Sequence, residues 1–111
     1  MDAPKFQSQS IYKISQDCDY KGDDFWDWSV WIDASEQELD KIDYVTYVLH
    51  PTFKPPVKKV EDRASHFRLI ASGWGTFTLF AKLHMKNGDE VHLELELELF
   101  YPEGLENSKL N

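Results

Sequence analysis

The strongest constraint on the fold is a strict alternation of apolar and polar side chains over the last third of the chain. It runs through residues 77–85 and again through residues 91–101. Successive side chains of a β-strand point to opposite faces, so this period predicts two strands of an antiparallel pair with one wet face. Asn87-Gly88 marks the turn between them. The apolar positions are Phe77, Leu79, Ala81, Leu83 and Met85 in the first strand and Val91, Leu93, Leu95, Leu97 and Leu99 in the second.

The same alternation predicts a pairing register. Opposed residues of a hairpin point to the same face, and a slip of one residue would turn the apolar side chains to water. A three-residue loop, Asn87-Gly88-Asp89, keeps apolar residues opposite one another. We therefore expect Met85 to face Val91 and His84 to face His92 on the wet side. Two solvated histidines, rather than a metal site, are the expectation there, because no standard ligand spacing accompanies them.

The rest of the chain predicts further short strands joined by turns. Their composition is aromatic and β-branched, as strands favour. Residues 17–24 predict an acidic loop, and residues 34–41 a helical turn in which Ser35 and Glu38 form a capping box. Without strand–helix alternation or an internal repeat, the pattern indicates an all-β fold, a two-sheet antiparallel sandwich. The strands are expected over residues 11–15, 25–32, 42–49, 57–60 and 66–71.

Length and composition indicate one domain in a reducing compartment. A chain of 111 residues fits a single domain over residues 1–111, with a core over about 25–101 and loose ends at 1–10 and 104–111. The lone Cys18 cannot form an internal disulfide. The first residues lack the apolar run of a signal peptide, and no stretch is long enough to span a membrane. We therefore expect a cytoplasmic protein with no membrane partner.

The net charge argues against a nucleic-acid partner. Twelve basic and 20 acidic side chains give −8, whereas nucleic-acid binding draws its affinity from phosphate neutralisation. The charge favours solubility and tolerates a basic partner such as a lysine-rich peptide. The sequence shows no serine elbow, phosphate loop, zinc motif or dinucleotide fingerprint. We therefore predict a protein without catalytic residues, cofactor or metal.

Two short segments stand out as candidate binding loops. His50-Pro51-Thr52-Phe53 and Ser72-Gly73-Trp74-Gly75 each place a large ring between predicted strands, beside small or polar neighbours. Loop tips on a rigid β scaffold commonly carry binding sites. An alternative interpretation is structural. Phe53 and Trp74 would then be edge or core aromatics, and Gly73 and Gly75 would serve to turn the chain between strands.

In order along the chain, these motifs resemble the YEATS domain, most closely its prokaryotic branch. The resemblance runs roughly from Trp28 to Tyr101 and implies an immunoglobulin-like sandwich that reads acylated lysine. Its motifs are Trp28-Ser29-Val30-Trp31-Ile32, Ile42-Asp43-Tyr44-Val45, Leu49-His50, His50-Pro51-Thr52-Phe53, Pro55-Pro56-Val57 and Gly73-Trp74-Gly75-Thr76-Phe77.

The resemblance also implies roles for individual residues. A flat acyl amide would stack between Phe53 and Trp74; the Thr52 hydroxyl would accept its N–H, and the Trp74 backbone N–H would donate to its carbonyl. His50 would brace Thr52. A third wall is expected near Phe25 and Trp26, although Gly22-Asp23-Asp24 departs from the family pattern there. The full set of expected binding residues is Phe25, Trp26, His50, Thr52, Phe53, Ser72, Gly73, Trp74 and Gly75.

Two functions follow from the resemblance. The first is a non-enzymatic module that binds an acylated lysine, of the acetyl or crotonyl type, on a protein or peptide. The alternative is an interaction or sensor module of a prokaryotic conflict or signalling system. Such a module would dock a partner protein without acyl-lysine.

Overall fold

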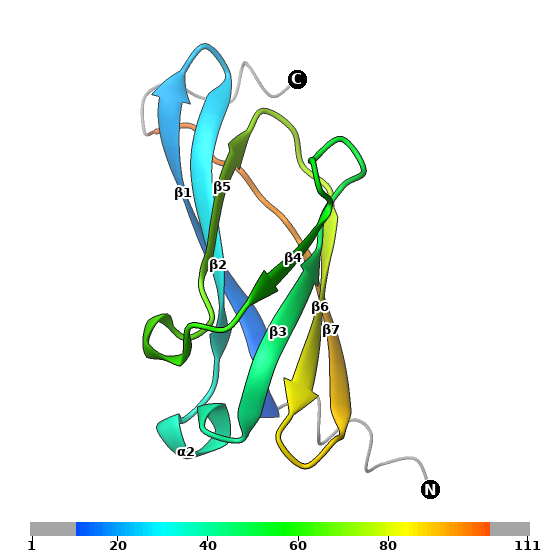
Figure 1. Cartoon of the computed structure of the whole chain (residues 1–111). Coiled ribbons are helices and arrows are strands. Elements are labelled where there is room, and N and C mark those ends of the chain that lie inside the picture. Colours follow the sequence, from blue (N-terminus) through cyan, green and yellow to red (C-terminus); the bar gives the residue numbers. More distant parts are fainter. Residues whose placement is uncertain (1–10, 103–111) are drawn as a thin grey trace, which may run out of the picture.

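The computed structural model describes residues 11–102, which form two antiparallel sheets packed face to face. One sheet has the strand order β1-β2-β5 and the other β4-β3-β6-β7 (Figure 1). The two-sheet sandwich predicted from the sequence is therefore confirmed, whereas the ends predicted to be loose lie outside the described residues. The strands are β1 (Lys13–Gly22), β2 (Phe25–Asp33), β3 (Ile42–Val48), β4 (Val57–Val60), β5 (Leu69–Gly73), β6 (Thr78–Met85) and β7 (Glu90–Glu96).

Short connections lie at the two ends of the sandwich. The β1–β2 turn, the β3–β4 loop and the β5–β6 loop lie at one end, and the β6–β7 turn lies at the other (Figure 1). The opposite end also carries α2 (Glu36–Leu39), where the Ser35 hydroxyl accepts a hydrogen bond from the Glu38 N–H at 3.2 Å. The predicted helical turn and the Ser35 half of its capping box are thus confirmed, whereas the Glu38 carboxylate accepts a hydrogen bond from the Tyr12 hydroxyl, at 3.1 Å. A 3-10 turn, η1 (Arg63–Ser65), precedes β5.

The acidic loop predicted over residues 17–24 was wrong for most of its length, because β1 continues to Gly22. Side chains of β1 alternate between half-buried positions, such as Cys18 and Tyr20, and exposed ones, such as Asp17 and Asp19. The acidic side chains of β1 are therefore all on its exposed face. The chain then reverses at Asp23 and Asp24, whose φ angles of 55° and 56° suit a tight hairpin turn.

The predicted register of the β6–β7 hairpin was also wrong, by two residues. Leu83 pairs with Val91, and His84 pairs with Glu90 rather than with His92. The two faces were predicted correctly, because a shift of two residues keeps every side chain on its own side of the sheet.

The position of one glycine explains this shift. The Met85 N–H donates to the Asp89 carbonyl at 2.8 Å, and the Gly88 N–H donates to the Met85 carbonyl at 2.9 Å. The loop therefore consists of residues 86–88, and Gly88 is its last member, with a φ of 99°. Three-residue hairpin loops place their left-handed residue last, whereas the prediction had put Gly88 in the middle.

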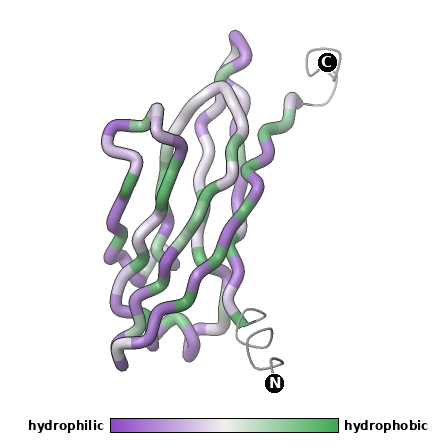
Figure 2. The backbone as a smooth tube through the Cα atoms, turned by 90° about the vertical axis from the view of Figure 1, so that its right-hand side faces the viewer, coloured by the Kyte–Doolittle hydropathy of each residue, from purple (hydrophilic) through white to green (hydrophobic). Residues whose placement is uncertain are grey.

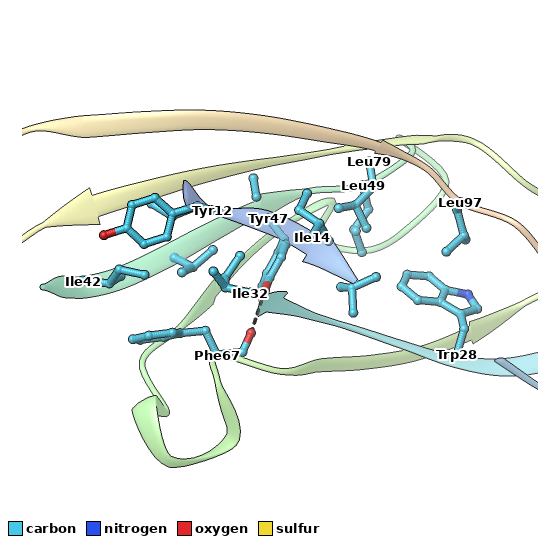
Figure 3. Packing of buried hydrophobic residues seen from close by; sticks show 14 of the residues in the cluster. Tyr12, Ile14, Trp28, Ile32, Ile42, Tyr47, Leu49, Phe67, Leu79 and Leu97 are labelled. Carbon is cyan, nitrogen blue, oxygen red and sulfur yellow. Dashed lines mark hydrogen bonds between the residues drawn. The ribbon is translucent and has the colours of Figure 1, made fainter. Parts of the chain in front are cut away.

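The core lies between the sheets and is built from the inward faces of the strands. Trp28, Val30 and Ile32 of β2 are buried and lie on one face of the strand. Tyr12 and Ile14 are buried in the same cluster, so the core begins before residue 25. Figure 3 shows these side chains meeting those of the four-stranded sheet. The buried set is Tyr12, Ile14, Trp26, Trp28, Val30, Ile32, Leu39, Ile42, Val45, Tyr47, Leu49, Phe67, Leu79, Ala81, Leu83, Leu97 and Leu99.

One buried hydrogen bond ties the core to the segment before β5. The Tyr47 hydroxyl donates to the Phe67 carbonyl at 2.6 Å, the dashed line in Figure 3. Phe67 is fully buried and has a φ of 59°, which a phenylalanine rarely adopts. Burial of its ring and this hydrogen bond hold it in that conformation.

The outer faces of the strands are mostly polar. Hydrophobic and hydrophilic residues follow one another along the strands in Figure 2, as expected for sheets that bury one face. No helix within residues 11–102 is long and apolar enough to cross a membrane.

Candidate binding pocket

The β3–β4 and β5–β6 loops form an open pocket of about 560 Å³ at one end of the sandwich. Two loops twenty residues apart in the sequence supply most of its walls, and β2 supplies Phe25 at its start. The pocket is lined by Phe25, His50, Thr52, Phe53, Lys54, Ser72, Gly73, Trp74, Gly75, Thr76 and Phe77. All but one of the residues singled out from the sequence are therefore brought together.

The two large rings of the pocket differ in how firmly they are held. Phe53 is half-buried, and its ring packs at 6.1 Å from Trp28 and 5.6 Å from Phe77, measured between centroids. Trp74 is 76% exposed, and its ring makes no aromatic contact with any residue in the described range. The rings of Phe53 and Trp74 thus line one pocket without closing on each other. One wall is anchored in the core, and the other projects into solvent.

His50 holds Thr52 in a fixed orientation. Its Nδ1 atom lies 3.0 Å from the Thr52 hydroxyl oxygen and accepts a hydrogen bond from the Thr52 backbone N–H at 3.2 Å. An Nδ1 atom that accepts from an N–H carries no proton itself. At Nδ1 the Thr52 hydroxyl can then act only as a donor, sharing the single lone pair with the backbone N–H, and its own oxygen lone pairs stay available to accept from a ligand.

The glycines of the second loop do not seal the pocket by close packing. A Cβ added at Gly73 would lie 4.0 Å from the Phe53 ring, an ordinary contact, and one at Gly75 would meet nothing within 4 Å. Both stand at the pocket wall, so the absence of side chains leaves backbone groups accessible to a ligand.

Trp26 is the one expected site residue that lies elsewhere. Its side chain is 2% exposed and packs against Tyr20 and Tyr101, with centroids 5.1 and 5.0 Å apart. Its indole N–H donates to the Phe100 carbonyl at 2.8 Å. Side chains on a strand alternate, so Phe25 and Trp26 cannot both face the pocket. Only Phe25 does.

Sequence reasoning missed three lining residues, Lys54, Thr76 and Phe77. Lys54 and Thr76 directly follow the predicted residues Phe53 and Gly75, and Phe77 comes one residue after Thr76. Phe77 was assigned to the strand pattern and to a motif of the resemblance without a binding role, yet its ring contacts both Phe53 and His50. Chain adjacency to the two motifs is the signal that would have found all three.

A second, larger groove of about 740 Å³ lies between β1 and the segment after β7. Four carboxylates line it, from Asp17, Asp19, Glu96 and Glu98. Its acidic lining does not suit a flat uncharged amide, so we place the candidate site in the smaller pocket. No group of three or more potential ligands among residues 11–102 is placed to hold a metal ion.

Comparison with known proteins agrees with this fold. The family model described as the prokaryotic YEATS domain matches residues 26–98, about two thirds of the chain. The chain belongs to the prokaryotic YEATS family. The resemblance inferred from the sequence motifs is thereby confirmed, and the immunoglobulin-like sandwich is the fold of this family.

Individual YEATS relatives are distant. The Protein AF-9 homolog of Candida albicans is 29% identical over 79 residues, which cover 68% of this chain and 30% of that protein. The chain therefore spans less than a third of the length of this curated relative.

Two solved Yaf9 YEATS domains share the fold. One, recognising an H3K122suc peptide, has a TM-score of 0.59 and 22% identity, covering 79% of this chain and 68% of that one. The other, bound to H3K27ac, has a TM-score of 0.57 and 20% identity, covering 80% and 71% of the two chains. At this identity the likeness establishes the fold.

Proposed function

We propose that this YEATS domain is a non-enzymatic recognition module for acylated lysine on a protein or peptide. The observation that carries the proposal is the shared open pocket of Phe53 and Trp74, with the Thr52 hydroxyl oriented beside them by His50. A planar acyl amide inserted there would contact both rings. Aromatic contacts of this kind contribute about 0.5–1.5 kcal/mol beyond the area they bury.

Hydrogen bonds would give the pocket its selectivity for an amide. The Thr52 oxygen would accept the amide N–H, because its own proton is directed to His50. The backbone N–H of Trp74 would donate to the acyl carbonyl. A ligand lacking the amide would leave this acceptor and this donor of the pocket without partners. A buried polar group in that state costs about 1–3 kcal/mol, so such a ligand would bind more weakly by that amount.

Charge would exclude unmodified lysine. Among the described residues that line the pocket, none is an aspartate or glutamate that could pair with an ammonium group. Lys54 at the wall would repel it. Desolvating an ammonium without a partner is far more costly than burying a neutral amide.

The solved relatives support this class of ligand. A Yaf9 YEATS domain recognises a succinylated H3 peptide and another binds an acetylated one. Histones are not implied for the present chain, whose partner would be defined by the acylated lysine it carries. The proposal assigns no catalytic step. In a nucleophilic triad a third group orients the base, but among residues 11–102 no carboxylate lines the pocket to orient His50.

A titration with acetyl-lysine and crotonyl-lysine peptides tests the proposal. We expect crotonyl-lysine to bind, and Phe53→Ala and Trp74→Ala each to weaken binding about tenfold or more, which corresponds to about 1.4 kcal/mol. Phe80→Ala is the matched control, because Phe80 is also an exposed aromatic, at 46%, but lies on the outer face of β6. It should bind like the wild type.

Failure to bind at millimolar peptide would overturn the reader function and favour the alternative, a module that docks a partner protein. The outer face of the four-stranded sheet would then be the surface to examine. There Val57, Val48 and Phe80 are cross-strand neighbours in one row and are 50%, 37% and 46% exposed.

A further inference from the structure

Lys54 is the one lysine or arginine among the described residues that line the pocket. It follows Phe53 directly in the β3–β4 loop, is exposed, and has no carboxylate partner among residues 11–102. Nearby Lys59 differs, because its ammonium lies 3.2 Å from the Glu61 carboxylate and 4.4 Å from the Tyr44 ring centroid. The charge of Lys54 is therefore available to a ligand.

From this charge we infer that the pocket prefers acyl groups that end in a carboxylate, such as succinyl, over uncharged acyl groups of the same size. The inference rests on the proposed function and concerns the far end of the acyl chain. The amide would still lie between Phe53 and Trp74. A carboxylate two methylenes beyond the acyl carbonyl would pair with the flexible Lys54 ammonium.

The preference for an anionic ligand is expected at the pocket and not over the rest of the surface. The chain carries a net charge of −8, which disfavours an anionic ligand over most of its surface. The pocket lining contains no acidic side chain among its described residues, so nothing there competes for Lys54. Among the described lining residues, His50 is the other titratable side chain, and its Nδ1 is already engaged by Thr52.

The expected effect is modest, because the pair remains in contact with solvent. Exposed ion pairs of this kind change affinity by about two- to fivefold and weaken as salt screens them.

Three peptides of one sequence test the inference, with the lysine crotonylated, succinylated, or carrying the uncharged monoamide of the succinyl group. Isothermal titration at low and high salt measures the ratio of succinyl to monoamide affinity. We expect wild-type protein to favour succinyl by about two- to fivefold at low salt, with a smaller ratio at high salt. Lys54→Gln should bring the ratio to about one, and Lys54→Arg should restore it.

Lys59→Gln is the matched control, since it makes the same change in net charge on an exposed lysine of β4 outside the pocket. It should keep the wild-type ratio. If crotonyl-lysine binds but the wild-type ratio is one, the inference is overturned while the reader function stands. If the ratio survives Lys54→Gln, another group selects the anion and Lys54 does not. If no peptide binds, the reader function itself fails.

Discussion

The Nδ1 atom of His50 contacts both the hydroxyl and the backbone N–H of Thr52, at 3.0 and 3.2 Å. Two hydrogen bonds to one side chain fix where the Thr52 proton points. They leave an oxygen facing a pocket whose rings come from separate loops. An amide ligand of the proposed kind would therefore meet an acceptor that is already oriented, which would lower the ordering cost of binding.

Replacing Thr52 by valine should weaken crotonyl-lysine binding. Valine keeps the branched shape but removes the acceptor, so the ligand N–H would be buried without a partner. At about 1–3 kcal/mol, the dissociation constant should rise roughly five- to hundredfold. Thr52→Ser is the control, because it retains the hydroxyl. Equal affinities of the valine and serine variants, measured by calorimetry, would show that Thr52 does not accept from the ligand.

The two ring variants should differ in stability although both lose binding. Trp74 is 76% exposed, so Trp74→Ala should change the free energy of unfolding by no more than about 0.5 kcal/mol. Phe53 packs against Trp28 and Phe77, so Phe53→Ala should cost more, on the order of 1–3 kcal/mol. Urea denaturation measures both. A large loss in Trp74→Ala would mean that its ring supports the fold and would remove its value as a binding probe.

Most of the fold was predictable because alternation reports which side of a sheet each residue occupies. It gave the two faces of the β6–β7 hairpin, where Leu79, Ala81 and Leu83 are buried as expected. It failed at β1, where aspartates on the outer face concealed a strand whose inner face includes Cys18 and Tyr20. The exact register of the β6–β7 hairpin was not predicted correctly, because a shift of two residues leaves the alternation unchanged. Only the conformation of Gly88 decides between the two registers.

The pocket was predictable in part for a different reason. Motif resemblance indicated which loops meet, and the structure brings Phe53 and Trp74 to one cavity. Resemblance could not decide between Phe25 and Trp26, whereas the alternation of β2 does, since Trp26 is buried on the inner face. Lys54 was left out of the predicted site, because nothing in the sequence distinguishes a lysine that lines a pocket from one on a solvated strand edge.

Gly88→Ala should destabilise the protein, because Gly88 closes the β6–β7 loop with a φ of 99°. Nothing lies within 4 Å of the added Cβ, so the cost is backbone strain alone, about 1–2 kcal/mol. Gly75→Ala is the matched control. Its Cβ also meets open space, and its φ lies outside the left-handed range, so its stability should stay within about 0.5 kcal/mol of wild type. Equal stabilities of the two variants by thermal denaturation would contradict the loop assigned here.

Tyr47→Phe should also lower stability. The change removes the donor at 2.6 Å from the Phe67 carbonyl and leaves that buried oxygen without this partner. The expected loss is about 1–3 kcal/mol in the free energy of unfolding. Tyr44→Phe is the control, because Tyr44 is only half-buried and its ring stacks on His84 through its face, at 4.2 Å. Losses of equal size in the two variants would show that the buried hydrogen bond contributes nothing.

Stability should fall at alkaline pH because buried tyrosines resist ionisation. Burial raises the pKa of Tyr47 above its ordinary value, and burial with the hydrogen bond to Glu38 raises the pKa of Tyr12 to about 12. An unfolded tyrosine loses its proton near pH 10, so from about pH 10 upward the unfolded chain binds fewer protons than the folded one. The stability that the neutral phenols contribute is complete below about pH 10. Above it, each tyrosine removes up to about 1.4 kcal/mol per pH unit.

Urea denaturation at several values between about pH 9 and 11.5 measures this slope. Tyr47→Phe removes one of the two buried phenols, so its stability should decline less steeply than that of the wild type, even though it starts lower. The comparison of slopes separates ionisation from the lost hydrogen bond, because only ionisation depends on pH. Parallel declines in the two proteins would mean that Tyr47 ionises as readily in the folded chain as in the unfolded one, and that the core around it admits water.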